Sequence, residues 1–366
     1  MNYVSYVMLG FALLGIIDRM IGNKFHLGEE FEKGFELLGT IVLTMAGMIV
    51  LSPLIASLLE PFFNSVYKAL HIDPSVLTSS IFANDMGGAQ LAKSISKNET
   101  LGYFNGLVVG SMVGATVSFT IPFAITVVGK ERQKELTLGL LCGIVTVPVG
   151  CAVGLAFCRL PVLVAITDLI PIIIFAGIIA AGLLLFPQIC IKAFKVFGIF
   201  IKVLISAGLA LGLIKFVTGR EVIKGLGSFE DAMDICIACA VALAGAFPAL
   251  KIISAIISKP LGALGRMIRI NEKSTAGFIS SLASNVPTLK MMNEMDSKGA
   301  MLNSAFAVSA SFVIADHLAF TLAYNKSYLG IVMLSKLISG LCAVWFAAFI
   351  YKKVGKSVLG KEEENG

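Results

Sequence analysis

The chain has 366 residues, of which 57% are hydrophobic and 14% are charged, and its mean hydropathy is +0.90. A soluble domain carries about 25% charged residues, so this composition excludes a soluble globular protein. Apolar runs of roughly 20 residues recur along the chain, long enough to cross a bilayer as helices. We therefore predict an all-α polytopic membrane protein in which residues 1–366 form a single membrane-embedded domain.

The charge and the cysteines exclude other classes of protein. The net charge of +6 does not indicate a nucleic-acid partner, because Lys and Arg lie between the apolar runs, where the positive-inside rule places them. Cys236 and Cys239 have the spacing of a redox or zinc pair, but no second pair or histidine cluster accompanies them. We expect neither a metal site nor a cofactor.

The apolar runs are placed from the N-terminus onward. Tyr3–Ile17 has no Lys or Arg before it, so we interpret it as the first permanent span and not as a cleaved signal peptide. Two apolar segments, at about 74–96 and 274–293, are interrupted in their middle. About nine full spans are expected around them, at 3–22, 35–59, 101–129, 136–157, 162–186, 199–217, 232–257, 300–324 and 328–350.

The two interrupted segments look like copies of one element. At an offset of 200 residues, the identical pairs include Ser80 with Ser280 and Ala83 with Ala283. Interrupted membrane helices in corresponding halves of a chain indicate the binding site of a transporter. We therefore predict a repeat A at about 74–130 and a repeat B at about 274–325, each an interrupted segment followed by a span.

The distribution of basic residues favours re-entrant hairpins over single crossings. If both segments are hairpins, about 20 of the 29 Lys and Arg residues lie on one side of the membrane, as the positive-inside rule requires. This places the N-terminus outside and the tail 351–366 in the cytoplasm. Five spans separate the hairpins, so they enter from opposite faces. The predicted architecture is an inverted repeat whose hairpin tips meet near the midplane.

The first tip contains Asn84, Asp85, Gly87 and Gly88. A carboxylate at membrane depth costs roughly 2.5–3.5 kcal/mol, so Asp85 needs a reason to be there. A cationic substrate or a coupled cation is one reason, and the two glycines would let a substrate approach the backbone. The alternative is that Asp85 caps the second half-helix.

The second tip contains Asn285 and Thr288 at the corresponding place. An amide both donates and accepts hydrogen bonds, so Asn285 suits a hydroxyl group; helix capping is again the alternative. A site with a carboxylate at one tip and an amide at the other would fit a small molecule with one charged and one neutral polar end.

Three further candidates lie outside the tips. Asp316 lies deep in the predicted span 300–324 and either takes part in binding or pairs with Lys336. His317 follows it but points about 100° away on a helix, and is either a proton relay or a simple hydrogen-bonded histidine. Ser111 either lines a pathway or packs between helices.

Several motifs are similar to those of the ethanolamine-utilisation transporter family. They include Asp85-Met86-Gly87-Gly88, Phe119-Thr120-Ile121-Pro122, the stretch 143–150 and Asp316-His317-Leu318, and the resemblance runs from end to end. It implies a bacterial inner-membrane protein that moves ethanolamine into the cell. Asp85 would then hold the ammonium, Asn285 the hydroxyl, and Asp316 would be a second anionic contact or a pH-dependent carboxylate.

Other functions remain open at this stage. One is a channel-like facilitator, and another is a carrier of a different small cationic or nucleoside-like solute. An intramembrane aspartyl protease built on Asp85 and Asp316 is disfavoured because the Gly-x-Gly-Asp context is missing. We expect no enzyme, and no direct use of ATP because a Walker motif is absent. The choice between H⁺ and Na⁺ as coupling ion, and whether the chain forms a homo-oligomer, stay undecided.

Overall fold

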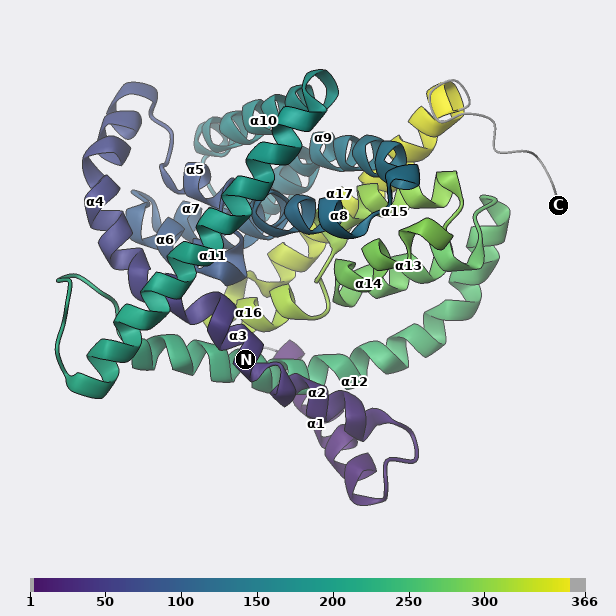
Figure 1. Ribbon diagram of the computed structural model, residues 1–366, viewed down its shortest axis with the longest axis horizontal. Helices are drawn as coiled ribbons and strands as arrows, with labels where there is room; N and C mark the ends of the chain where they lie inside the picture. The colour runs from purple at the N-terminus through teal and green to yellow at the C-terminus, as the bar shows by residue number, and fades with distance from the viewer. Residues whose placement is uncertain (1–2, 356–366) are drawn as a thin grey trace.

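The computed structural model describes residues 3–355, which are helical almost throughout and contain no strand (Figure 1). Eight helical stretches in this range are long and apolar enough to cross a membrane: Tyr3–Met20, Leu27–Leu70, Glu99–Val127, Lys130–Phe157, Val162–Leu185, Pro187–Thr218, Phe229–Met267 and Asp316–Lys353. The prediction of an all-α, multi-pass membrane protein is confirmed.

The N-terminal part begins with an antiparallel helix pair, α1 (Tyr3–Met20) and α2 (Leu27–Glu36), at the lower edge of Figure 1. Asp18 stabilises the turn between them by accepting the backbone N–H groups of Phe25 (2.9 Å) and Leu27 (2.7 Å). The chain then continues through α3 (Leu38–Ile41), a π-helical turn η1 (Val42–Ala46) and α4 (Gly47–Leu70).

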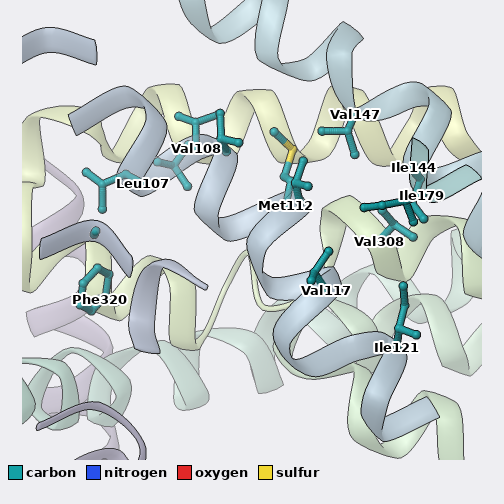
Figure 2. Close-up of a cluster of buried hydrophobic side chains, with 14 of the residues drawn as sticks. Leu107, Val108, Met112, Val117, Ile121, Ile144, Val147, Ile179, Val308 and Phe320 are labelled. Carbon is teal, nitrogen blue, oxygen red and sulfur yellow. The ribbon is translucent and has the colours of Figure 1, made fainter. Parts of the chain in front are cut away.

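The centre of the molecule is built from helices of both halves. The stretch α7 (Glu99–Phe104), η3 (Asn105–Gly114), η4 (Thr116–Thr120) and α8 (Ile121–Val127) includes two π-helices. After the 3₁₀ turn η5 (Lys130–Arg132), α9 (Gln133–Phe157) packs against α15 (Ser297–Ala310) and α17 (Leu329–Ile350). Figure 2 shows the apolar side chains that fill this centre, among them Met112, Val147 and Val308.

The outer helices are α10 (Val162–Leu185), α11 (Pro187–Thr218) and α12 (Phe229–Met267). Large apolar side chains of α10 and α11, such as Ile178 and Val203, are exposed. Exposed apolar faces of this kind are expected where a helix meets lipid and not water. The long α12 runs along the lower side of the molecule in Figure 1.

The first interrupted segment folds back on itself. It consists of α5 (Ser75–Ser79), the 3₁₀ turn η2 (Asn84–Met86) and α6 (Gly88–Ile95). Its two ends are joined by Asp73, whose Oδ2 accepts the N–H groups of Lys97 (2.9 Å) and Asn98 (3.0 Å). The segment therefore begins and ends at the same place.

The second interrupted segment is closed in a similar way. It consists of α13 (Glu272–Ala283), α14 (Asn285–Lys290) and the 3₁₀ turn η6 (Met292–Glu294). Asp296 Oδ1 accepts the N–H of Asn271 (2.9 Å) and the hydroxyl of Ser274 (2.6 Å). In both segments the closing hydrogen bond joins residues 25 positions apart.

The predicted span 300–324 is wrong as one continuous helix, which is why eight stretches and not nine qualify as spans. Helix α15 ends at Ala310, residues 311–315 are not helical, and α16 (Asp316–Asn325) follows. Phe312 has a left-handed backbone with φ of 65°. The N–H groups of Phe312 and Ile314 bond to the carbonyls of Ser281 (3.0 Å) and Leu282 (2.9 Å) at the end of α13. Backbone groups at the interruption 311–315 thus form hydrogen bonds with backbone groups at the end of α13, where the second folded segment is interrupted.

The C-terminal part continues through the 3₁₀ turn η7 (Lys326–Tyr328) and α17 to a final π-helical turn, η8 (Tyr351–Gly355). The predicted tail 351–366 therefore starts as helix, and its residues 356–366 lie outside the described range.

Candidate functional site

The first folded segment lies directly on a glycine face of the following stretch. A Cβ at Gly106 would lie 2.9 Å from Ala89 Cα, and a Cβ at Gly114 would lie 2.1 Å from the carbonyl oxygen of Phe82. Neither distance is tolerable for a real side chain, so only glycine permits this approach. The backbone around Asp85 is held in place by this contact.

Asp85 itself does not cap a helix. Gly87, with φ of +80°, is the N-cap residue of α6 and makes no side-chain capping bond. The N–H of Gly88 bonds instead to the carbonyl of Ala83 at 3.0 Å. The capping alternative for Asp85 is therefore wrong. Its side chain is 24% exposed and lies at the surface of a cavity.

A cavity of about 100 Å³ brings Asp85 and Asp316 together. We call it the acidic cavity. Its polar lining residues are the two aspartates and two exposed threonines, Thr40 and Thr44. The Thr44 hydroxyl donates to the carbonyl of Thr40 at 2.9 Å, so its oxygen can still accept a hydrogen bond from a ligand. The other lining residues have small or apolar side chains: Leu37, Ile41, Met45, Cys239, Leu243 and Ala319.

Asp316 is the first residue of α16, directly after the interruption at 311–315. The carboxylate of Asp316 belongs to the first turn of α16, where the positive end of the helix dipole favours a negative charge. This position stabilises a negative charge next to the cavity.

Two basic side chains stand behind the acidic cavity. His317 is 2% exposed, and its Nε2 lies 3.9 Å from Asp85 Oδ2. Lys336 is fully buried, and its Nζ donates to the carbonyl oxygen of Ser111 at 2.7 Å. Within residues 3–355 no ion pair joins Lys336 to Asp316. The alternative in which Asp316 pairs with Lys336 is therefore not found in the structure. Ser111 contributes its backbone carbonyl as the acceptor of the Lys336 hydrogen bond.

The remaining predicted residues lie beside the cavity and do not line it. Asn84 is fully buried, and neither polar atom of its amide has a hydrogen-bond partner. Asn285 donates from Nδ2 to Thr120 Oγ1 (2.9 Å), and Thr288 donates to the carbonyl of Gly277 (2.9 Å). The second tip is nevertheless close, because Ala283 packs against the cluster of Leu243, Ala315 and Ala319.

Of the ten lining residues, the sequence predicts Asp85 and Asp316 and misses the other eight, including both threonines. Thr40 and Thr44 are four positions apart on one helical face, a spacing that could have suggested them. Cys239 is considered in the sequence only as part of a redox or zinc pair, and the structure places it in the cavity lining. The sequence also gives no signal for the interruption at 311–315, which contains neither glycine nor proline.

Comparison with known proteins adds the family. Residues 1–350 match the family model described as "Ethanolamine utilisation protein, EutH". The chain is 37% identical over 360 residues to a protein of Listeria monocytogenes named "Probable ethanolamine permease EutH", with 98% of this chain and 96% of the relative covered. It is 33% identical to a protein of Escherichia coli with the same name, with 99% and 98% covered.

A third relative, "Uncharacterized protein YxeR" of Bacillus subtilis, is 35% identical over 348 residues, with 95% of this chain and 94% of the relative covered. No solved structure matches the chain. The family match spans nearly the whole chain and includes both folded segments, the interruption at 311–315 and the acidic cavity between them. This chain therefore belongs to the EutH family of ethanolamine utilisation proteins.

Proposed function

We propose that this protein is a secondary transporter that carries ethanolamine across the bacterial inner membrane into the cell. Full-length relatives named as probable ethanolamine permeases support the substrate. The observation that carries the proposal is the acidic cavity, in which two carboxylates and two hydroxyls surround a space of about 100 Å³. One water takes about 30 Å³ of liquid, so the cavity has room for one small organic molecule.

Ethanolamine has an ammonium group, protonated near neutral pH like that of lysine, and a hydroxyl two carbons away. Asp85 and Asp316 bind the ammonium in this proposal, and Thr44 or Thr40 at the cavity edge binds the hydroxyl. Asn285, predicted for the hydroxyl, would reach the substrate only after a movement of the second tip, because its Nδ2 is occupied by Thr120. The Oδ1 of Asn285 has no hydrogen-bond partner, so in this proposal Asn285 binds the substrate hydroxyl in another state of the transport cycle.

The charges of the site support a cationic substrate. With both carboxylates ionised and the buried Lys336 protonated, the empty site has one negative charge in excess. A bound ammonium brings the sum to zero. Because charge at membrane depth is costly when it is not compensated, a substrate with one positive charge is favoured over a neutral or an anionic one.

The proposed transport cycle uses the two folded segments as re-entrant hairpins. The hydrogen bonds across 25 residues in each segment support this interpretation. Five of the apolar stretches, Glu99–Val127, Lys130–Phe157, Val162–Leu185, Pro187–Thr218 and Phe229–Met267, lie between the segments. An odd number of crossings puts the hairpins on opposite faces, as in transporters with inverted repeats and alternating access. The N-terminus is then outside and the C-terminus cytoplasmic.

The test is uptake of labelled ethanolamine into liposomes that contain the purified protein. We expect saturable uptake that is accelerated by unlabelled ethanolamine inside the vesicles, which a carrier shows and a channel does not. Asp85→Asn and Asp316→Asn should reduce uptake strongly. Asp234→Asn, an exposed aspartate of α12, is the matched control. Uptake without acceleration from inside would favour the channel-like facilitator, and absence of uptake by the parent protein would refute the proposed function.

A further inference from the structure

A second buried carboxylate lies outside the acidic cavity. Asp168 of α10 is 1% exposed, and its Oδ1 accepts a hydrogen bond from Asn105 Nδ2 at 2.8 Å. Asn105, in the π-helix η3, is fully buried and donates from the same nitrogen to Ser75 Oγ at 3.0 Å. Ser75 in turn donates to Asp73 Oδ1 at 2.6 Å. The proposed function uses none of these groups as substrate ligands.

Two acceptor oxygens in this cluster have no donor. They are Asp168 Oδ2 and Asn105 Oδ1, and both side chains are almost completely buried. Rotating the Asn105 amide does not solve the problem. Its Nδ2 faces two acceptors, because the Ser75 hydroxyl hydrogen is already given to Asp73. Buried acceptors without partners are costly, and a buried carboxylate with a single neutral donor more so.

The neighbouring groups do not supply a positive charge. Asp73 lies beyond Ser75, and its carboxylate is used by Ser75 and by Lys97 and Asn98 through their backbone N–H groups. Cys151 of α9 and Cys158, directly after its last residue, are the other titratable side chains near Asp168. Within residues 3–355 no Lys, Arg or His forms an ion pair with Asp168. No group of residues 3–355 therefore supplies the missing donor.

We propose that Asp168 is a proton-binding site. One proton, taken from bulk water and placed on Asp168 Oδ2, is donated to Asn105 Oδ1. Asn105 Nδ2 already donates in the opposite direction, so the acid and the amide form a ring with two hydrogen bonds. A single proton thereby gives both unpartnered oxygens a partner and removes the buried charge.

The position of this proton would affect the segment that carries Asp85. From Asn105 the hydrogen bonds continue through Ser75 to Asp73, the residue that joins the two ends of the first folded segment. Loss of the proton would leave an ionised carboxylate buried with one donor, which weakens the contact between α10 and the base of this segment. If the proposed function is correct, Asp168 is where protons influence transport.

The first experiment needs no substrate. Infrared spectra of the full-length protein in lipid should contain a protonated carboxyl C=O band at neutral pH that is lost in Asp168→Asn and kept in Asp234→Asn. Asparagine at 168 can donate to Asn105 Oδ1 and accept from Nδ2, so this variant should fold. Asn105→Leu is the second variant: it keeps the acid but removes its donor, and the band should shift to higher frequency. A band unchanged in both variants would overturn the proposal.

The second experiment separates a proton from a sodium ion. The melting temperature of the parent protein should be the same in sodium chloride and in potassium chloride. If sodium raises the melting temperature of the parent but not that of Asp168→Asn, the site binds sodium and the proposal of a proton site is wrong.

The third experiment rests on the proposed function. An inward proton gradient should alter ethanolamine uptake by the parent and by Asp234→Asn, but not by Asp168→Asn, whose affinity for ethanolamine should be unchanged. If the infrared band is assigned to Asp168 but no variant transports ethanolamine, the proposed substrate is wrong and the proton site stands. If uptake by Asp168→Asn follows the gradient like the parent, the proposed influence of this proton on transport is refuted.

Discussion

Replacing Asp85 by asparagine tests the assignment of the ammonium site most directly. The substitution keeps the size of the side chain and removes its negative charge from the acidic cavity. A hydrogen bond to a charged group contributes roughly 1.5–3 kcal/mol, and about 1.4 kcal/mol corresponds to a factor of ten in affinity. We therefore expect ethanolamine binding to weaken by roughly 10- to 150-fold.

The same variant should not lose stability. The side chain of Asp85 is 24% exposed and caps no helix, so neutralising it removes a partly buried charge and no structural hydrogen bond. Binding of labelled ethanolamine to purified protein is the assay, with the melting temperature measured on the same samples and Asp234→Asn as control. An affinity within a factor of about three of the parent, which corresponds to only about 0.7 kcal/mol, would refute the role of Asp85 as the ammonium ligand.

Three further predictions concern the hydroxyl contact and the first folded segment. Thr44→Val should weaken ethanolamine binding by roughly 2- to 12-fold, the value of one neutral hydrogen bond of about 0.5–1.5 kcal/mol, and leave binding of ethylamine unchanged; equal losses for both ligands would contradict the hydroxyl contact. Gly114→Ala should destabilise the protein by about 1–3 kcal/mol through overpacking against Phe82, seen as a lower melting temperature that Gly330→Ala, in open space, does not share. Asp73→Ala should cost at least about 3 kcal/mol, because it removes several hydrogen bonds to one carboxylate; a protease-resistant variant that melts like the parent would contradict its role in closing the segment.

The charged residues of the site could be predicted from the sequence because charge is rare in apolar runs. Asp85 and Asp316 were both identified in this way, and the cavity brings them together. The interruption before Asp316 could not be predicted. Residues 311–315 contain no glycine or proline, and their backbone groups are satisfied by Ser281 and Leu282. These hydrogen-bond partners come close only in the folded molecule, so no local sequence pattern predicts the interruption.

The contacts of Asn285 also depend on the folded structure. Its position in the repeat is equivalent to that of Asp85, but its amide bonds to Thr120, 165 residues away in sequence. The hydroxyl ligands proposed instead, Thr40 and Thr44, belong to a helix outside both repeats. Repeat symmetry in the sequence therefore locates the region of the site, while the individual ligands depend on which helices pack around it.

The backbone contacts divide the lining of the acidic cavity between two units, which in this state are also joined by the side-chain hydrogen bond from Asn285 to Thr120. The first folded segment rests on the glycine face of Glu99–Val127, where close backbone packing leaves no room for sliding. The second is bonded through Ser281 and Leu282 to the interruption at 311–315 and so to Asp316. Asp85 belongs to the first unit and Asp316 to the second, and the acidic cavity lies between them. An ammonium bound by both carboxylates would draw the units together, and its release would let them separate. We therefore expect a disulfide between cysteines introduced across the two units to stop transport, while one introduced within either unit leaves it intact.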